Sequence, residues 1–383
     1  MPNLPPEIIT DILTRLPVKS LLRFRCVSKP WCTLIDSRSF TKLHLNRSLQ
    51  TGSNHYIILG FLAIYSIDLN CLDSATLIRP PFSSSDISNS CNGLVLVLAT
   101  NPYIWNPFTR KFRELPANSV DYPVGVEVVS AYETFGFAYD SENDDYFVLR
   151  VVEFRGPHLD WISSEAKVYS SKLNSWRRIG DFPYQLPYKR VWGAHLNGVL
   201  HTAVRNSNMG WSIMGFDVSN GMHSAIPIPD LPGAASSDGY AEFTVEVLGG
   251  CLCLVCPRRK DRTDVWIMKE YRVKESWTML LSVAPPVVEP YYKISPLAFS
   301  KDGREVLLNH DDKQLMWYNL KKKTVRSVSV DGMPFVFYGD VCVSSLVRPD
   351  GLEGEDDDDQ EKRLSKISRK RDDFLSEGFK LVL

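Results

Sequence analysis

Three cysteines are the residues whose spacing most suggests a metal site in this sequence. Cys251, Cys253 and Cys256 fall within the stretch GGCLCLVCP. A structural zinc ion takes four ligands, and the chain must turn between them. This run instead alternates like a buried strand, where free cysteine is a common residue. We therefore predict core thiols, with neither a metal nor a cofactor.

Catalytic motifs give no better candidate. His195 and His201 flank the turn signal Asn197-Gly198, and we predict that both lie on strand surfaces. The sequence contains no glycine-rich phosphate loop, nucleophile elbow or paired metal-binding histidine motif. We expect a protein that is not an enzyme.

Binding is the remaining chemistry, and aromatic side chains in loops are its best candidates. The stretches DYPVGVEVVSAYET, RGPHLDWISSE and DFPYQLPYKRVW combine aromatic residues with loop-forming ones. Loops on a rigid scaffold carry recognition, whereas aromatics at repeated positions pack between sheets. The residues that we predict to contact a target are Tyr122, Trp161, Tyr184, Tyr188 and Arg190.

Apolar residues crowd the first forty positions at helical spacing. From Ile8 to Leu16 they form a stripe roughly 140° wide, and Pro17 stops that helix. Two more short helices are expected, the last capped by Ser28. Three such helices cannot bury this much apolar surface among themselves. We expect a partner protein to cover it; a helical cap packed on the rest of the chain is the alternative.

The stretch LPPEIITDILTRLPVKSLLRFRCVSKPWCTLIDSRSF resembles an F-box, the motif by which substrate receptors join cullin-type ubiquitin ligases. The resemblance implies that the apolar stripe docks on a small Skp-type adaptor, which bridges to a cullin scaffold. It assigns the following residues to the adaptor face or its support: Leu4, Pro5, Ile8, Ile12, Leu13, Leu16, Pro17, Leu21, Cys26, Val27 and Trp31.

Short strand-like runs separated by turn residues fill the chain beyond residue 50. Their aromatic anchors recur at intervals of 40, 64, 47, 50 and 51 residues, at Tyr65, Trp105, Tyr169, Phe216, Trp266 and Trp317. A period near fifty is typical of a four-stranded propeller blade of the kelch size, and a two-sheet sandwich would not explain it. We predict an α+β multidomain protein: a short three-helix F-box, then an all-β, propeller-like domain of about six kelch-sized units.

The stretches IWNPFTRKFRELP, FGFAYDSENDDYFVLRV, KVYSSKLNSWRRI and DVWIMKEYRVKESWTML resemble, in this order, the F-box-associated interaction domain of plants. In that family the domain captures the protein to be ubiquitinated. The resemblance implies the non-catalytic substrate-recognition subunit of an SCF-type (Skp-cullin-F-box) ubiquitin ligase. It further implies proteasomal degradation of an immune receptor in negative regulation of plant defence. The alternatives are a kelch-like scaffold outside any ligase and a glycan-binding β-propeller.

Four segments are predicted: an F-box over 1–45, a β domain over 50–348, a charged flexible linker over 349–372 and an apolar tail over 373–383. The linker holds seven acidic residues: Glu353, Glu355, Asp356, Asp357, Asp358, Asp359 and Glu361. A basic block follows, typical of a weak nuclear-import patch: Lys362, Arg363, Arg369, Lys370 and Arg371.

Composition limits the partners and the compartment. A formal net charge of -1 provides no field that would attract nucleic acid or an anionic membrane. No apolar run reaches the roughly 18 residues of a membrane span, and the N-terminal MPNLPPEII does not resemble a signal peptide. Eight cysteines in such a chain favour reduced thiols. We expect a cytoplasmic and nuclear protein without nucleic-acid binding or membrane insertion.

Overall fold

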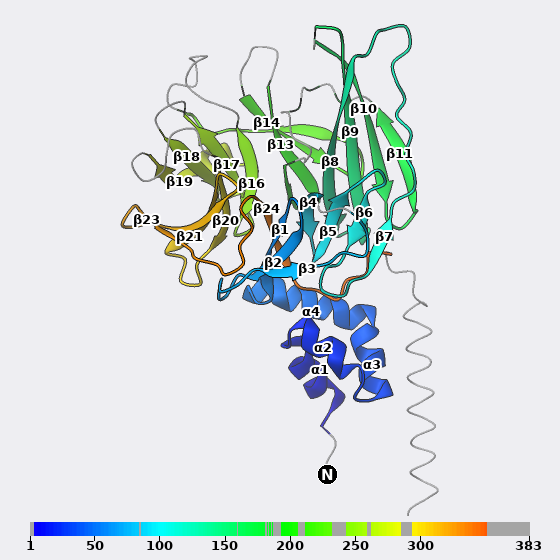
Figure 1. Cartoon of the computed structure of the whole chain (residues 1–383), viewed down its shortest axis with the longest axis vertical. Coiled ribbons are helices and arrows are strands. Elements are labelled where there is room, and N and C mark those ends of the chain that lie inside the picture. Colours follow the sequence, from blue (N-terminus) through cyan, green and yellow to red (C-terminus); the bar gives the residue numbers. More distant parts are fainter. Residues whose placement is uncertain are drawn as a thin grey trace, which may run out of the picture.

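The structure is a computed structural model with a helical part and a β part (Figure 1). It describes residues 4–83, 86–158, 160–180, 182, 184, 186, 193–205, 211–231, 243–258, 262–284 and 293–350. Two predicted target contacts, Tyr188 and Arg190, lie outside the described residues, as do the apolar tail and nearly all of the charged linker.

The helical part contains four α-helices within the described residues: α1 (Pro6–Thr14), α2 (Val18–Phe24), α3 (Lys29–Asp36) and α4 (Arg38–Thr51). The hydroxyl oxygens of Ser28 and Ser37 accept hydrogen bonds from the first turns of α3 and α4, as N-caps do. Gly52, with φ of 64°, ends α4 in the left-handed region. The helical part is therefore longer than the three helices predicted, and the boundary placed at residue 45 falls inside α4.

The described β part consists of six four-stranded antiparallel sheets arranged as the blades of a propeller (Figure 1). Blade 1 contains β24 (Tyr338–Val343), β1 (His55–Gly60), β2 (Ile64–Asp68) and β3 (Thr76–Ile78). Blade 2 contains β4 (Asp86–Cys91), β5 (Leu94–Leu98), β6 (Tyr103–Trp105) and β7 (Phe112–Glu114). Blade 3 contains β8 (Ser130–Asp140), β9 (Asp145–Arg155), β10 (Trp161–Ser170) and β11 (Ser175–Gly180). Blade 4 contains β12 (Ala194–Leu196), β13 (Val199–Arg205), β14 (Trp211–Asp217) and β15 (His223–Ile226). Blade 5 contains β16 (Thr244–Leu248), β17 (Cys251–Pro257), β18 (Thr263–Met268) and β19 (Trp277–Val283). Blade 6 contains β20 (Ile294–Phe299), β21 (Glu305–His310), β22 (Gln314–Asn319) and β23 (Thr324–Ser327). A short 3-10 helix, Lys274–Ser276, precedes β19.

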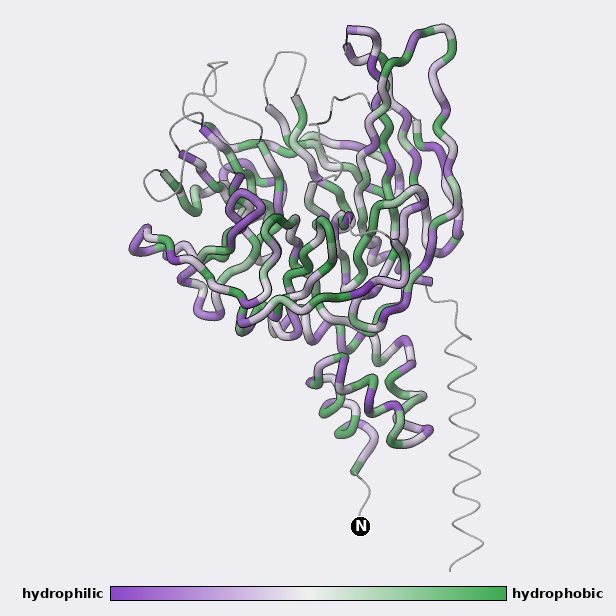
Figure 2. The backbone as a smooth tube through the Cα atoms, viewed as in Figure 1, coloured by the Kyte–Doolittle hydropathy of each residue, from purple (hydrophilic) through white to green (hydrophobic). Residues whose placement is uncertain are grey.

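The six predicted repeat units are confirmed as the six blades. Each aromatic anchor lies on the third strand in the order of its sheet, on β2, β6, β10, β14, β18 or β22. Trp105, Tyr169 and Phe216 are buried, as expected for side chains that pack between neighbouring sheets. Figure 2 shows the hydrophobic residues concentrated along the strands and the hydrophilic ones at the turns.

The ring closes through the last strand. β24 pairs antiparallel with β1, from His55 opposite Val343 to Gly60 opposite Tyr338. The first blade therefore contains strands from both ends of the β part. This pairing joins residues almost 290 positions apart and makes β24 the innermost strand of blade 1.

The chain that follows β24 enters the core of the helical part. Leu346 packs, together with Phe108 of the β6–β7 turn, against the buried helical residues Leu13, Val18, Leu21, Ile35 and Phe40. Part of the apolar excess in the helices is therefore covered by the chain itself.

Asn106 holds this segment in place with its fully buried side chain. Its Nδ2 donates to the carbonyl oxygens of Ser345 (3.0 Å) and Val347 (2.8 Å). Its Oδ1 accepts from the backbone N–H groups of Phe108 (2.9 Å) and Thr109 (3.1 Å). One amide thus ties the closing segment to the turn that supports the helices.

Candidate functional site

An uncovered row of large apolar side chains lies on the helical part. Leu4, Ile8, Ile12 and Val27 are between 46% and 60% exposed, and we call them the apolar ridge. Ile8 and Ile12 are four residues apart on α1 and therefore lie on the same face. Exposed apolar surface of this kind marks an interaction site.

The other predicted adaptor residues divide into two groups. Pro5, Pro17 and Cys26 are exposed beside the ridge. Leu13 and Leu21 are buried in the helical core, while Leu16 and Trp31 are half-buried and pack against it. The ring of Trp31 meets that of Phe24 edge-on at 5.7 Å. These four residues support the ridge from beneath.

Polar contacts fix the orientation of α1. The carboxylate of Asp11 forms ion pairs with Arg15 (2.7 Å) and with Arg47 of α4 (3.0 Å). The hydrogen bond from Arg15 lowers the pKa of Asp11. His44 of α4 is fully buried, and its Nε2 lies 2.9 Å from the carbonyl oxygen of Leu16. Burial lowers the pKa of His44, so the neutral ring donates to that carbonyl.

The helical part is also joined to blade 3 by charge. Asp144, in the turn between β8 and β9, forms ion pairs with Arg38 and with Lys42 (2.9 Å) of α4. It also accepts a hydrogen bond from the hydroxyl of Tyr139. The helices therefore lie on the propeller face that carries this turn, which we call the near face (Figure 1).

Blade 3 rises above the other blades on the opposite, far face (Figure 1). Its strands β8 and β9 have eleven residues each and β10 has ten. At its raised end, residues 122–132, which we call the crest, present exposed apolar side chains. These are Tyr122, Val124, Val126, Val129 and Tyr132; Val124 is 99% exposed.

Buried charges hold the chain that leads to the crest against the blade. Arg150 donates from Nη1 to the carbonyl oxygen of Asn118 at 2.7 Å. Lys167 donates to the carbonyl oxygen of Ser119 at 2.8 Å and pairs with Asp121 at 3.0 Å. Polar groups buried under a loop in this way fix its path, so the crest stands on a rigid support.

The described target candidates gather around blade 3. Tyr122 lies on the crest, with its ring 5.3 Å from that of Phe154. Trp161 begins β10 at the same raised end and is half-buried. Tyr184 packs in the neighbouring space between blades 3 and 4, against Phe182 at 5.2 Å. The sequence interpretation named the loop that forms the crest but chose its aromatic residue Tyr122 and not its valines.

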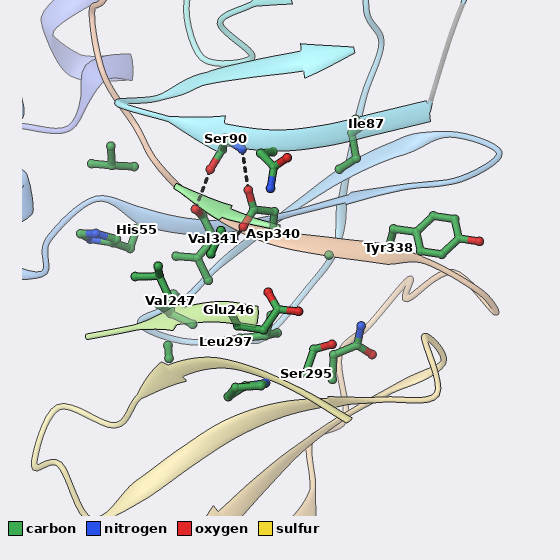
Figure 3. Close-up of a pocket in the computed structure, with 18 of the residues that line it drawn as sticks. His55, Ile87, Ser90, Glu246, Val247, Ser295, Leu297, Tyr338, Asp340 and Val341 are labelled. Carbon is green, nitrogen blue, oxygen red and sulfur yellow. Dashed lines mark hydrogen bonds between the residues drawn. The ribbon is translucent and has the colours of Figure 1, made fainter. Parts of the chain in front are cut away.

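A cavity of about 2710 Å³ runs along the inner strands β4, β12, β16, β20 and β24 (Figure 3). Figure 3 shows Glu246 and Asp340 among the residues that line it, with the carboxylate of Asp340 pointing toward Ser90 of β4. Asp340 accepts hydrogen bonds from the backbone N–H groups of Ser90 (2.6 Å) and Val341 (2.9 Å). Burial raises the pKa of this carboxyl to about 6. Its bond to Ser90 ties the closing strand to blade 2, which is a structural role.

The cysteines of β17 lie in a strand, as predicted. Cys253 and Cys256 are buried, and burial raises the pKa of both thiols, so they stay protonated at neutral pH. Cys251 is half-buried. Across the described ranges, no three Cys, His, Asp or Glu residues are grouped as metal ligands, and no helix is long and apolar enough to span a bilayer.

The predicted surface position is wrong for His201. This histidine is fully buried, with Nε2 2.8 Å from the hydroxyl of Tyr271 and Nδ1 3.2 Å from the carbonyl oxygen of Ala194. His195 is half-buried and lines the central cavity. Burial lowers the pKa of each to about 4. β13 faces blade 5 across this interface, which explains why a polar residue beside a hairpin turn is buried.

Both the helical part and the β part match known protein families. Residues 1–43 match the F-box domain, and residues 58–347 match the F-box associated beta propeller domain. F-box protein CPR1 of Arabidopsis thaliana is 35% identical over all of both chains, and a second F-box protein of that plant is 32% identical with the same coverage. An F-box/kelch-repeat protein of A. thaliana is 30% identical over 80% of this chain and 85% of its own. Among solved structures, an oligogalacturonate lyase of Vibrio parahaemolyticus has a TM-score of 0.42 at 10% identity, covering 71% of this chain and 72% of its own, a likeness too weak to bear on function.

Proposed function

The chain belongs to the F-box proteins that carry an F-box associated β-propeller domain, and from this we propose that it is the substrate-recognition subunit of an SCF-type ubiquitin ligase. F-box proteins generally act in such ligases as non-catalytic receptors that bind a Skp-type adaptor. One observation carries the proposal. The propeller contributes Leu346 and Phe108 to the helical core, yet the apolar ridge remains exposed. An apolar surface that the described part of the chain leaves open marks a site for a partner.

The two ends of the molecule have separate roles in this proposal. The ridge binds the adaptor and, through it, the cullin. The far face, with the crest as its most exposed apolar feature, binds the target protein. The associated ubiquitin-conjugating enzyme supplies the chemistry, while this chain supplies proximity and orientation.

The target forms the finer part of the proposal. Similarity to F-box protein CPR1 along the whole chain supports a common role within the family. We propose that the target is an immune receptor whose proteasomal degradation restrains plant defence. The ligase would act in the cytoplasm and the nucleus.

Binding of a purified Skp-type adaptor tests the ligase role. Ile8→Asp/Ile12→Asp should weaken binding on the order of 100-fold, because buried apolar anchors carry most interface energy. Leu43→Asp, an equally exposed leucine on α4 away from the ridge, should bind like the unaltered protein. Leu13 is unsuitable for this test, since it is buried and its substitution would unfold the helices.

The decisive result is that of the unaltered protein. If it is folded, as circular dichroism and a cooperative melt would show, and still fails to bind the adaptor, the ligase role is refuted. The chain would then be an interaction scaffold outside a ligase.

A further inference from the structure

Positive charge collects where the helical part meets blade 2. Arg25 ends α2, Lys111 and Arg113 belong to the β6–β7 hairpin, and Arg348 follows the closing strand. We call these four residues the junction cluster. The acidic groups that act on Lys111 are Asp36, which lies 2.7 Å from Arg25, and the side chain of Asp350.

Three members of the junction cluster lie close enough to interact electrostatically. Burial lowers the pKa of Lys111, and Arg348 and Arg25 lower it further, while Asp36 and Asp350 act in the opposite direction. Around Lys111, three cations therefore face two carboxylates, and Arg113 follows on the same hairpin. The imbalance leaves net positive charge around Lys111, which is exposed, whereas Arg25, Arg113 and Arg348 are half-buried.

The described chain ends beside this cluster. Arg113 donates from Nη1 to the backbone carbonyl oxygen of Asp350 at 3.0 Å. The seven acidic residues of positions 353–361 begin three residues later. Three residues span at most about 10 Å, so the acidic run is tethered within reach of the cluster. Such a short tether gives an effective concentration on the order of millimolar.

We propose that the acidic run 353–361 of this chain docks on the junction cluster. Arg25 directly precedes Cys26 and Val27, so the docked run lies beside one end of the apolar ridge. Each surface ion pair contributes little, but several charges on one tether act together. The contact is reversible and is screened by salt. Its effect on adaptor binding rests on the proposed function; the docking itself does not.

Zero-length carbodiimide cross-linking of the full chain tests the docking directly. Carboxylates of the run should couple to Lys111 at roughly 0.02 M salt, and the yield should fall several-fold at roughly 0.5 M. Lys322, an exposed lysine in the β22–β23 turn of blade 6, is the matched control and should couple much less. A variant with the seven acidic residues replaced by their amides should lose the Lys111 product. Equal yields at Lys111 and Lys322, or a Lys111 yield insensitive to salt, would overturn the proposal.

Adaptor binding provides a second readout. The amide variant should bind the adaptor a few-fold faster than the unaltered chain, since the run no longer lies beside Val27. If the amide variant is unchanged but Lys111→Glu/Arg348→Glu binds the adaptor more weakly, the cluster belongs to the adaptor interface and the docking proposal fails. Because the cross-linking requires no adaptor, failure of the docking and failure of the ligase role remain distinguishable.

Discussion

Arg38 and Asp144 form an ion pair that joins α4 to the β8–β9 turn. The hairpin that starts at this turn ends at the crest, and eleven residues at about 3.3 Å each span roughly 35 Å. The same pair of strands therefore contacts the helical part at one end and carries the proposed target surface at the other. In a receptor that works by orientation, this hairpin sets the distance between adaptor and target.

Asp144→Asn should weaken the contact between α4 and the β8–β9 turn. The change removes the ion pairs to Arg38 and Lys42, and we expect a loss of about 1–2 kcal/mol in the free energy of unfolding, since Asp144 is largely buried. Urea denaturation measures it. Asp302→Asn, at an exposed pair with Arg304, is the control and should leave the transition midpoint unchanged. Equal midpoints for the two variants would contradict a structural role for Asp144.

Asn106→Ala should destabilise the protein more strongly. It removes four hydrogen bonds and leaves the buried carbonyl oxygens of Ser345 and Val347 unpaired, at a cost of about 2–4 kcal/mol. Because Leu346 lies between them, adaptor binding should weaken as well. Asn101→Ala, which loses one exposed bond to Glu114, is the matched control in the same thermal melt.

Much of the fold could be predicted, because its repeat is local. One aromatic residue on the third strand of each blade produces a sequence period near fifty residues, which remains visible although the loops differ in length. The sequence allows helical structure to about Leu49 but does not predict α4 as a separate fourth helix. Its buried stripe contains the polar residues His44 and Ser48 beside Phe40 and Leu45, which hides the helical periodicity.

The candidate sites depend more on contacts between distant segments. The sequence correctly indicated that the helices bury too little of their own surface. It could not show that Leu346 covers part of that surface, because this contact depends on ring closure. Tyr122 was chosen because aromatic residues in loops suit recognition, and its contact with a target stays a prediction. Val124 and Val129 carry no distinguishing chemistry in the sequence.

Substitutions in the crest should separate target capture from adaptor binding. Val124→Asp/Val129→Asp places two charges on the exposed apolar surface, and we expect at least a ten-fold loss of target ubiquitination with adaptor affinity unchanged. Leu173→Asp, an exposed leucine at the opposite end of the same blade, is the control. Quantitative proteomics of ubiquitinated proteins would measure the loss. Identical profiles for both variants would place the target surface elsewhere.

Stability should fall as the pH drops below about 6.5. His195 and His201 have pKa values of about 4 in the folded protein, against about 6.5 in an unfolded chain. Between these values the unfolded chain binds more protons, so the free energy of unfolding decreases with decreasing pH, by on the order of 1 kcal/mol for each histidine at pH 5.5. Asp340 acts in the opposite direction, because its pKa of about 6 exceeds the ordinary value of 3.8, and it offsets part of this loss.

Two variants test the assignment of this pH dependence through urea unfolding at pH 7.5 and 5.5. His201→Gln can keep a hydrogen bond to Tyr271 without titrating, so the difference in stability between the two pH values should shrink. Asp340→Asn removes the opposing group, so the difference should grow. If the difference in stability between pH 7.5 and 5.5 stays the same in both variants, other groups determine the acid stability, and His201 and Asp340 do not contribute to it. A change in the stated directions would show that His201 and Asp340 account for the acid sensitivity of the propeller.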